Sequence, residues 1–196
     1  MTQGTGETAG PETEQTRRPG RSRVNCGRLD IRIARDGTWF YHGTPIGRKE
    51  MVRLFASILE RRADGTFWMA SPAEEGIVDV EDAPFVAVEL FAAGTGGEQN
   101  LSFRTNVEDL VPLDAAHPLR MAVPVTERTA PDAALHDDGR GAAPYLLVRK
   151  GLEARLSRAV YYELVTLGVE ERRDGAPVYG VWSDRIFFPL GCLTPD

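Results

Sequence analysis

Residues 48–65, RKEMVRLFASILERRADG, recur in altered form 110 positions later as residues 158–175, RAVYYELVTLGVEERRDG. Six of the eighteen aligned positions are identical, and the closing Asp-Gly pair is among them. The apolar positions also correspond, since Met51 aligns with Tyr161 and Phe55 with Val165. A repeat of this length indicates two related structural units, and the face between such units is a natural place for a cleft.

The first copy predicts a helix between two β-hairpins. Thr44-Pro45 provides a good N-cap followed by proline at the first helical position, so we expect a helix from Ile46 to about Arg62 that ends at Asp64-Gly65. Alternation of apolar and polar residues at 29–34 predicts a strand before this helix, and Asp36-Gly37 predicts a hairpin turn that leads into residues 38–41. Further strands are expected at residues 66–70, 76–80, 85–91 and 101–104.

The second copy predicts the same order of elements. A strand at 145–148 precedes a helix from Leu152 to about Leu167, and two short strands follow around Ser183-Asp184. We therefore expect an α+β fold with mainly antiparallel sheets, built from two related units. Residues 1–24 lack large apolar side chains and predict a disordered tail, and the aperiodic stretch 124–143 predicts a mobile loop. The expected units are residues 25–112 and 113–196.

Composition is that of an ordinary soluble protein. The 196 residues are 42% apolar and 27% charged, and the net charge of -6 argues against a general nucleic-acid binder. There is no secretory signal and no apolar run long enough to span a membrane, so we expect a cytoplasmic location. Cys26 and Cys192 lie near opposite ends and predict free thiols, although a disulfide between them stays open.

The chain resembles the bacterial domain-of-unknown-function family 1285. The resemblance is carried by IRIARDGTWFYHGTPIGRKEMVRLFASIL, VEDAPFVAVEL, FRTN, HPLR, YLLVRKGLEARLSRAVYYELV and GVWSDRIFFPLG, which span roughly residues 26–191. It implies a duplicated α+β core and a C-terminal half superficially similar to pleckstrin-homology-like folds. It also implies a nucleotide-like ligand between the halves and a role in signal transduction.

Two arginines occupy equivalent places in the first turns of the predicted helices, Arg48 and Arg158. A helix N-terminus offers unpaired N–H groups and partial positive charge, and a guanidinium group beside it suits a phosphate or carboxylate. Two such ends facing each other would form an anion pocket. Alternatively, each arginine pairs with a carboxylate of the neighbouring unit, such as Glu81, Asp82 or Glu153.

A second arginine group surrounds Gly151. Arg155 and Arg158 are three residues apart, so in a helix they share a face, and Arg149 lies close by. Such a cluster of like charges predicts either an anion or carboxylates between its members. The alternative is a solvated basic face beside Glu153.

Polar residues at the predicted strand ends are the remaining candidates. Glu81 and Asp82 precede a strand, and adjacent residues of an extended chain point to opposite faces, so turn capping or arginine pairing is favoured over acid–base catalysis. Arg104 and Asn106 end another strand, where a binding role competes with simple closure of a turn.

We expect a non-catalytic regulatory protein that binds a small anionic ligand, such as a nucleotide, between its units. Two alternatives stay open: an enzyme that uses Glu81 or Asp82 as a base, and a protein-interaction module that uses an exposed sheet edge or the loop. The histidines lack ligand spacing and phosphate-binding loop motifs are absent, so no metal or cofactor is expected. The predicted ligand-binding residues are Arg48, Asp82, Arg104, Asn106, Arg149, Arg155 and Arg158.

Overall fold

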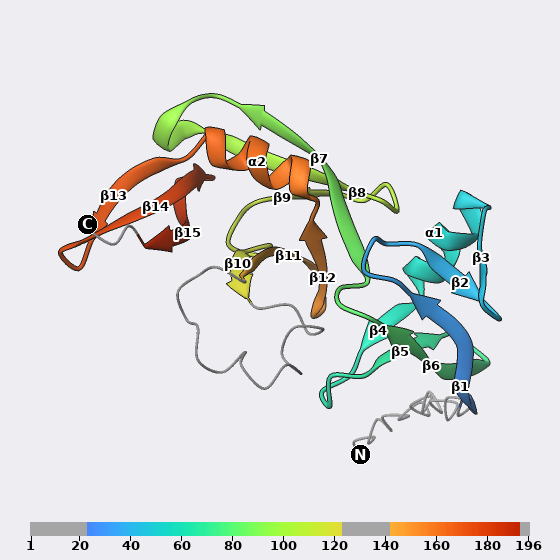
Figure 1. The fold of residues 1–196 in the computed structure, drawn as a ribbon. Coiled ribbons are helices and arrows are strands. Elements are labelled where there is room, and N and C mark those ends of the chain that lie inside the picture. Colours follow the sequence, from blue (N-terminus) through green and yellow to red (C-terminus); the bar gives the residue numbers. More distant parts are fainter. Residues whose placement is uncertain (1–22, 123–141, 193–196) are drawn as a thin grey trace, which may run out of the picture.

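The computed structural model describes residues 23–122 and 142–192 (Figure 1). The first six strands form one sheet in the order β3-β2-β1-β6-β5-β4, with α1 (Lys49–Ser57) beside it. In this sheet β1 and β6 run parallel and the other pairs are antiparallel. The strands are β1 (Val24–Ile33), β2 (Trp39–Tyr41), β3 (Thr44–Pro45), β4 (Leu59–Arg61), β5 (Phe67–Ala70) and β6 (Glu74–Val80).

The remaining strands form two further sheets, in the orders β10-β11-β12-β7-β8-β9 and β13-β14-β15. Only β12 and β7 pair in parallel among them, so the α+β fold with mainly antiparallel sheets is confirmed. The elements are β7 (Phe85–Ala93), the 3-10 turn η1 (Gly96–Glu98), β8 (Asn100–Thr105), β9 (Leu110–Pro112), β10 (Leu119–Ala122), β11 (Ala143–Arg149), β12 (Leu152–Leu156), α2 (Arg158–Thr166), β13 (Val169–Arg173), β14 (Ala176–Ser183) and β15 (Ile186–Cys192).

One large apolar core runs through both units. Trp39 of the first sheet, Phe85 and Phe103 of the second, and Leu164 of α2 are all fully buried within a single cluster. Burial of such side chains is the main stabilising term in folding, so the two units are held together by apolar contact as well as by the polar contacts described below.

The sheets divide the chain near residue 83, whereas the expected units met at residues 112 and 113. Strands β7 to β9 belong to the second sheet because Phe85, Val86 and Ala87 pair with β12. The predicted tail lies outside the described residues from 1 to 22, and the predicted loop lies outside them except for its last two residues, 142 and 143.

Both predicted helices are shorter than expected. Thr44-Pro45 does not start a helix: it forms β3, because Pro45 pairs with Phe40 and extends the preceding hairpin. Residues 59–61 leave the predicted helix to form β4 against β5. The predicted helix start at Leu152 is also wrong, because residues 152–156 alternate buried and half-buried positions as strand β12.

Candidate functional site

Asp82 lies where the two units meet, and its side chain is 1% exposed. Its Oδ1 accepts a 2.8 Å hydrogen bond from the Tyr145 hydroxyl. Its Oδ2 lies 3.2 Å from Nη1 of Arg155 and 3.8 Å from Nε of Arg35. The three partners come from β11, β12 and the turn after β1, so this carboxylate ties the first sheet to the second. A buried carboxylate needs such partners, because an isolated buried charge is very costly.

Beside this network is a cavity of about 410 Å³ that we name the arginine hollow. Its basic lining residues are Arg35, Arg155 and Arg158, and Asp36 is its acidic one. The remaining lining residues are mostly apolar or aromatic: Val86, Ala142, Ala143, Pro144, Leu156, Ser157 and Tyr161. The hollow therefore joins positive charge to an apolar wall, which is the usual composition of a small-molecule site.

The N-terminus of α2 opens at the same hollow. Ser157 is the N-cap, and its side chain accepts a hydrogen bond from the backbone N–H of Val160. Arg158 is the first helical residue and is exposed, and its guanidinium group lies 6.0 Å from the ring of Tyr162. Arg158 has no carboxylate partner within the described part of the chain. This free guanidinium group next to a helix N-terminus favours an anion.

Arg155 and Arg158 do not share a helix face as the sequence predicted. Arg155 lies on strand β12 and Arg158 begins α2, with the N-cap between them. Both nevertheless line the arginine hollow, because β12 leads directly into α2. Their proximity was therefore anticipated for the wrong structural reason.

A second cavity, of about 330 Å³, is bordered by Asp82 itself. Most of its charged groups are engaged: Arg120 holds Glu153 through two hydrogen bonds, Arg28 pairs with Asp79, and Arg61 donates to the carbonyl of Gly151 at 3.3 Å. Burial raises the pKa of the Tyr145 phenol, and its hydrogen bond to Asp82 raises that pKa further. The bond with Glu153 likewise raises the pKa of Arg120. This cavity offers an anion fewer available donors than the arginine hollow does.

Arg149 has a structural position away from the arginine hollow. It pairs with Asp109 and donates a 2.9 Å hydrogen bond to the carbonyl of Ala56, near the end of α1. Its guanidinium group also lies 5.0 Å from the ring of Phe85. Arg149 thus satisfies the C-terminal end of one helix and joins it to the second unit.

The predicted strand-end residues are also engaged within the protein. Arg104 pairs with Glu89 across β7 and β8. Asn106 bridges the units, since its Oδ1 accepts from the N–H of Val86 and its Nδ2 donates to the carbonyl of Gly37, each at 3.0 Å. These bonds reach segments 20 and 69 positions away, so the Asn106 side chain joins distant segments rather than closing the local turn that the sequence suggested.

Arg48 lies apart from the other predicted residues. It is the N-cap of α1, is exposed and makes no side-chain cap bond. It does not line the arginine hollow, and Figure 1 shows α1 and α2 on different units. The two helix N-termini therefore do not form one shared pocket.

Glu81 also has a structural partner set. Its carboxylate pairs with Arg32 and accepts a 3.0 Å hydrogen bond from the backbone N–H of Arg35. Glu81 thus fixes the turn that carries Arg35 to the place where the two units meet, which we call the junction. The pairing of Glu81 and Asp82 with arginines matches the alternative to catalysis that the sequence favoured.

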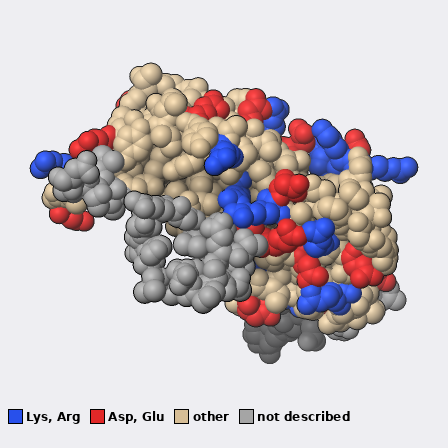
Figure 2. All heavy atoms as spheres, viewed as in Figure 1, with Lys and Arg blue, Asp and Glu red and all other residues tan. Residues whose placement is uncertain are grey.

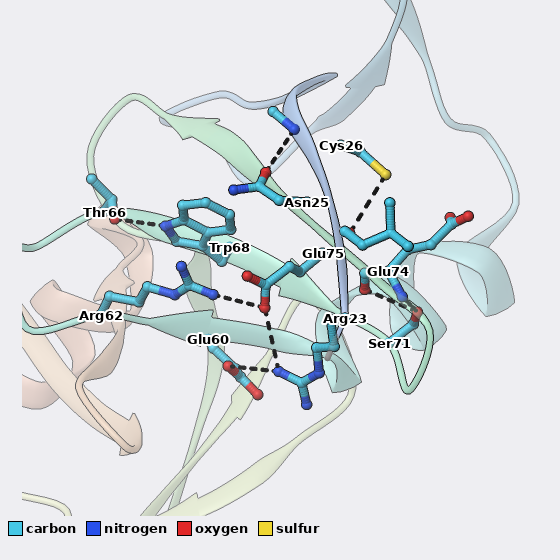
Figure 3. A network of polar contacts seen from close by, with 12 residues as sticks. Arg23, Asn25, Cys26, Glu60, Arg62, Thr66, Trp68, Ser71, Glu74 and Glu75 are labelled. Atoms are coloured by element: carbon cyan, nitrogen blue, oxygen red, sulfur yellow. Dashed lines mark hydrogen bonds and ion pairs between the residues drawn. The ribbon is translucent and has the colours of Figure 1, made fainter. Parts of the chain in front are cut away.

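Most charged groups near the junction are interleaved by sign, as Figure 2 shows. A further network at the edge of the first sheet is balanced in the same way (Figure 3). There Arg62 bonds Glu75 at 2.8 Å, and Arg23 approaches both Glu75 and Glu60. The hydrogen bond from Arg62 holds the pKa of the Glu75 carboxyl below its usual range. This network joins the start of β1 to β4 and β6.

Two residues of the site were missed from the sequence. Arg35 is the residue before the Asp36-Gly37 turn, and its position next to a sharp turn was the available signal. Tyr145 was recognised only as part of a strand, since no local pattern distinguishes a core tyrosine from one that bonds a carboxylate.

Other properties concern the described part as a whole. Among residues 23–122 and 142–192, neither helix has the length and apolar character needed to cross a membrane. Cys26 is exposed and free, and it makes only a weak 3.9 Å contact with the carbonyl of Val24.

Comparison with known proteins identifies relatives along nearly the whole folded chain. Residues 22–83 match the model of the N-terminal domain of DUF1285, a domain of unknown function, and residues 84–190 match that of its C-terminal domain. The boundary between these two models coincides with the division between the sheets. No curated protein matches the chain.

Two solved structures are similar to this protein. A DUF1285 family protein from Silicibacter pomeroyi DSS-3 is 44% identical with a TM-score of 0.73, over 88% of this chain and 85% of the other. A second, from Shewanella baltica OS155, is 29% identical with a TM-score of 0.51, over 70% of this chain and 91% of the other. The two family models together cover most of the sequence, and the chain belongs to the DUF1285 family.

Proposed function

We propose that this protein is a non-catalytic regulatory protein that binds a small phosphorylated metabolite in the arginine hollow. The single observation that supports it most is the meeting of Arg155, Arg158 and the α2 N-terminus at one cavity between the units. Guanidinium groups and helix N–H groups are the two commonest protein partners of phosphate.

The lining of the hollow favours an anion that carries an apolar or aromatic body. Arg155 and Arg158 line the hollow together with the acidic residue Asp36. Asp36 is already occupied, because its Oδ1 accepts a 2.9 Å hydrogen bond from the N–H of Thr38. Val86, Leu156 and Tyr161 provide contact area for the rest of the ligand. A nucleotide has this combination of charge and aromatic surface, and it is the candidate we favour.

The cellular setting is part of the same proposal. We place the protein in the cytoplasm, where phosphorylated metabolites occur, and assign the binding event a role in signal transduction. A pleckstrin-homology-like character of the second unit, which the family resemblance implied, would suit such a role.

A thermal-shift screen of nucleotides and phosphorylated sugars tests the proposal. Ligands that raise the melting temperature are then compared in Arg158→Ala, Arg155→Ala and Arg48→Ala proteins. We expect the shift to disappear in the first two variants and to persist in the third, because Arg48 holds the equivalent repeat position but lies outside the hollow. A shift of equal size in all three variants would place binding elsewhere and contradict the proposal.

A further inference from the structure

Asp82 is the anion that Arg155 contacts in the structure, and its two oxygens are held very differently. The hydroxyl of Tyr145 bonds Oδ1 at 2.8 Å, whereas Arg155 and Arg35 approach Oδ2 only at 3.2 and 3.8 Å. Charge-assisted bonds of arginine to carboxylate normally lie nearer 2.7–2.9 Å. The carboxylate is thus fixed by the tyrosine and only loosely paired with the guanidinium groups.

Arg155 is placed to change partners. It makes no other ion pair or side-chain hydrogen bond within the described residues, it lines the arginine hollow, and 24% of its side chain is exposed. Asp82 does not line that hollow; it lines the second cavity instead. A guanidinium group between an internal carboxylate and an open cavity can serve either one.

We propose that Asp82 is an internal competitor for the ligand of the arginine hollow. The incoming anion draws Arg155 away from Asp82, so that binding is an exchange of one anion for another rather than a simple addition. This inference rests on the proposed function and adds how its site is regulated and which ligands it selects.

The exchange leaves no isolated charge behind. When Arg155 turns to the ligand, Asp82 keeps the hydrogen bond from Tyr145 and the proximity of Arg35. Complete loss of partners would be strongly unfavourable for a carboxylate that is 1% exposed. The redundancy of partners around Asp82 is what makes the competition reversible.

Competition with a carboxylate also determines which chemical class of ligand the hollow binds. A monocarboxylate ligand carries the same charge as Asp82 and gains little by replacing it. A phosphoryl group carries a charge of about −1.5 to −2 at neutral pH and three acceptor oxygens, so it prevails over Asp82 for the guanidinium group. The hollow should therefore select phosphoryl compounds over carboxylates.

Titration calorimetry of the full chain with inorganic diphosphate tests this inference, using Asp82→Asn, Tyr145→Phe and Arg155→Met variants beside the unaltered protein. Asp82→Asn keeps an acceptor for Tyr145 but removes the competing charge, so diphosphate should bind about tenfold more tightly, which equals about 1.4 kcal/mol. Tyr145→Phe removes the bond that shares the charge of Asp82, so the carboxylate holds Arg155 more strongly and diphosphate should bind about threefold more weakly. Arg155→Met should reduce affinity at least about tenfold.

The opposite signs separate competition from damage, because a general disturbance of the junction would weaken binding in both Asp82→Asn and Tyr145→Phe. If Asp82→Asn were the one protein of the four that bound diphosphate measurably, the competition would have its strongest support. Unchanged or weaker binding in Asp82→Asn, together with loss in Arg155→Met, would overturn the competition and leave the proposed function standing. Equal binding in all four proteins, or binding in none, would overturn both. If Asp82→Asn does not fold, Tyr145→Phe decides: weaker binding supports the competition, and equal or tighter binding overturns it.

Discussion

The two copies of the repeat close their hairpins with different loops, although both carry Asp-Gly at the same place. In the first copy Arg62 and Thr66 share a backbone hydrogen bond, and Gly65 donates to the carbonyl of Arg62, so the loop has three residues. In the second copy Arg173 pairs directly with Ala176, which leaves a two-residue loop. Both of its residues have positive φ, 52° at Asp174 and 83° at Gly175, as a type I′ turn requires.

The residue after the glycine differs between the two loops. Thr66 donates to Oδ1 of Asp64 from both its N–H, at 3.0 Å, and its hydroxyl, at 2.6 Å. The turn at Asp36-Gly37 has the same following residue, and Thr38 likewise donates its N–H to Asp36. Ala176 has no hydroxyl to give. Asp-Gly-Thr therefore accompanies the longer loop in both of its occurrences, and Asp-Gly-Ala accompanies the shorter one.

The change in loop length shifts the strand register by one residue. Leu59 pairs with Met69 in the first copy, but the equivalent Val169 pairs with Gly180 rather than Tyr179. A one-residue shift exchanges the faces of a strand, so the second copy buries a different set of side chains. Two segments that both carry Asp-Gly at the same place thus bury different side chains. In addition, only the helix of the second copy has its N-terminus at the arginine hollow.

The largest predicted effect concerns Gly180, which pairs with Val169 on one side and lies against β15 on the other. A Cβ added at Gly180 would lie 2.4 Å from the carbonyl oxygen of Phe188, which is backbone and cannot move aside. Gly180→Ala should therefore cost about 3 kcal/mol or more in the free energy of unfolding. Gly191→Ala, in the neighbouring strand, meets no atom within 4 Å and should change stability by less than about 0.5 kcal/mol.

Chemical denaturation of the two proteins checks this contrast. Equal stability of Gly180→Ala and Gly191→Ala would show that the strands can separate at Gly180. The close approach of β15 to β14 would then not require a glycine at this position.

The sequence predicted elements well where the signal is local. Alternation identified β1, the apolar strand-forming stretches 85–91 and 145–148 identified β7 and β11, and helical spacing of apolar residues located α1 and α2, though not their ends. It failed where pairing partners decide: Leu152 to Leu156 have apolar residues compatible with either a helix or a strand, and contact with β7 and β11 selects the strand. Local propensity is routinely overridden in this way.

The candidate site shows the same limit. The arginines were recognised as a group, but their partners come from distant segments. Arg155 finds Asp82 across 73 positions and Arg149 finds Ala56 across 93. A single sequence contains the residue types but not the pairing. The separation of Arg48 from Arg158 could therefore be seen only once the two units were placed side by side.

The helix N-termini provide a prediction of intermediate size. Ser157 caps α2, so Ser157→Ala should destabilise the protein by about 1 kcal/mol. The N-cap of α1 is Arg48. Its side chain accepts no such bond, and it places positive charge at the positive end of the helix. Arg48→Ser should therefore stabilise the protein by about 0.5 kcal/mol. Thermal unfolding should show a lower melting temperature for Ser157→Ala and a higher one for Arg48→Ser. A change in the same direction in both variants would mean that capping does not distinguish the two helices.

A smaller effect is expected at the first hairpin. Thr66→Ala removes the hydroxyl bond to Asp64 and should lower the melting temperature by about 2 °C. That hydrogen bond is also the largest cause that holds the pKa of Asp64 below its ordinary value. The stability it contributes is present above the unfolded pKa of about 3.9 and is lost as pH falls through the lower folded value. Between about pH 5 and about pH 2, the melting temperature should therefore fall less steeply in Thr66→Ala than in the unaltered protein.

The reverse substitution, Ala176→Thr, should have the smallest effect and tests which factor governs the loop. It creates Asp-Gly-Thr in the second copy, which locally favours the three-residue loop. A longer loop would shift β13 by one residue against β14 and exchange the faces of its side chains, at a cost that exceeds any gain from one exposed hydroxyl. We therefore expect the two-residue loop to persist, with a change of less than about 1 °C in melting temperature. Backbone chemical shifts of Asp174 and Gly175 report their positive φ directly. Loss of that signature in Ala176→Thr would show that the turn residue selects the register of β13 against β14.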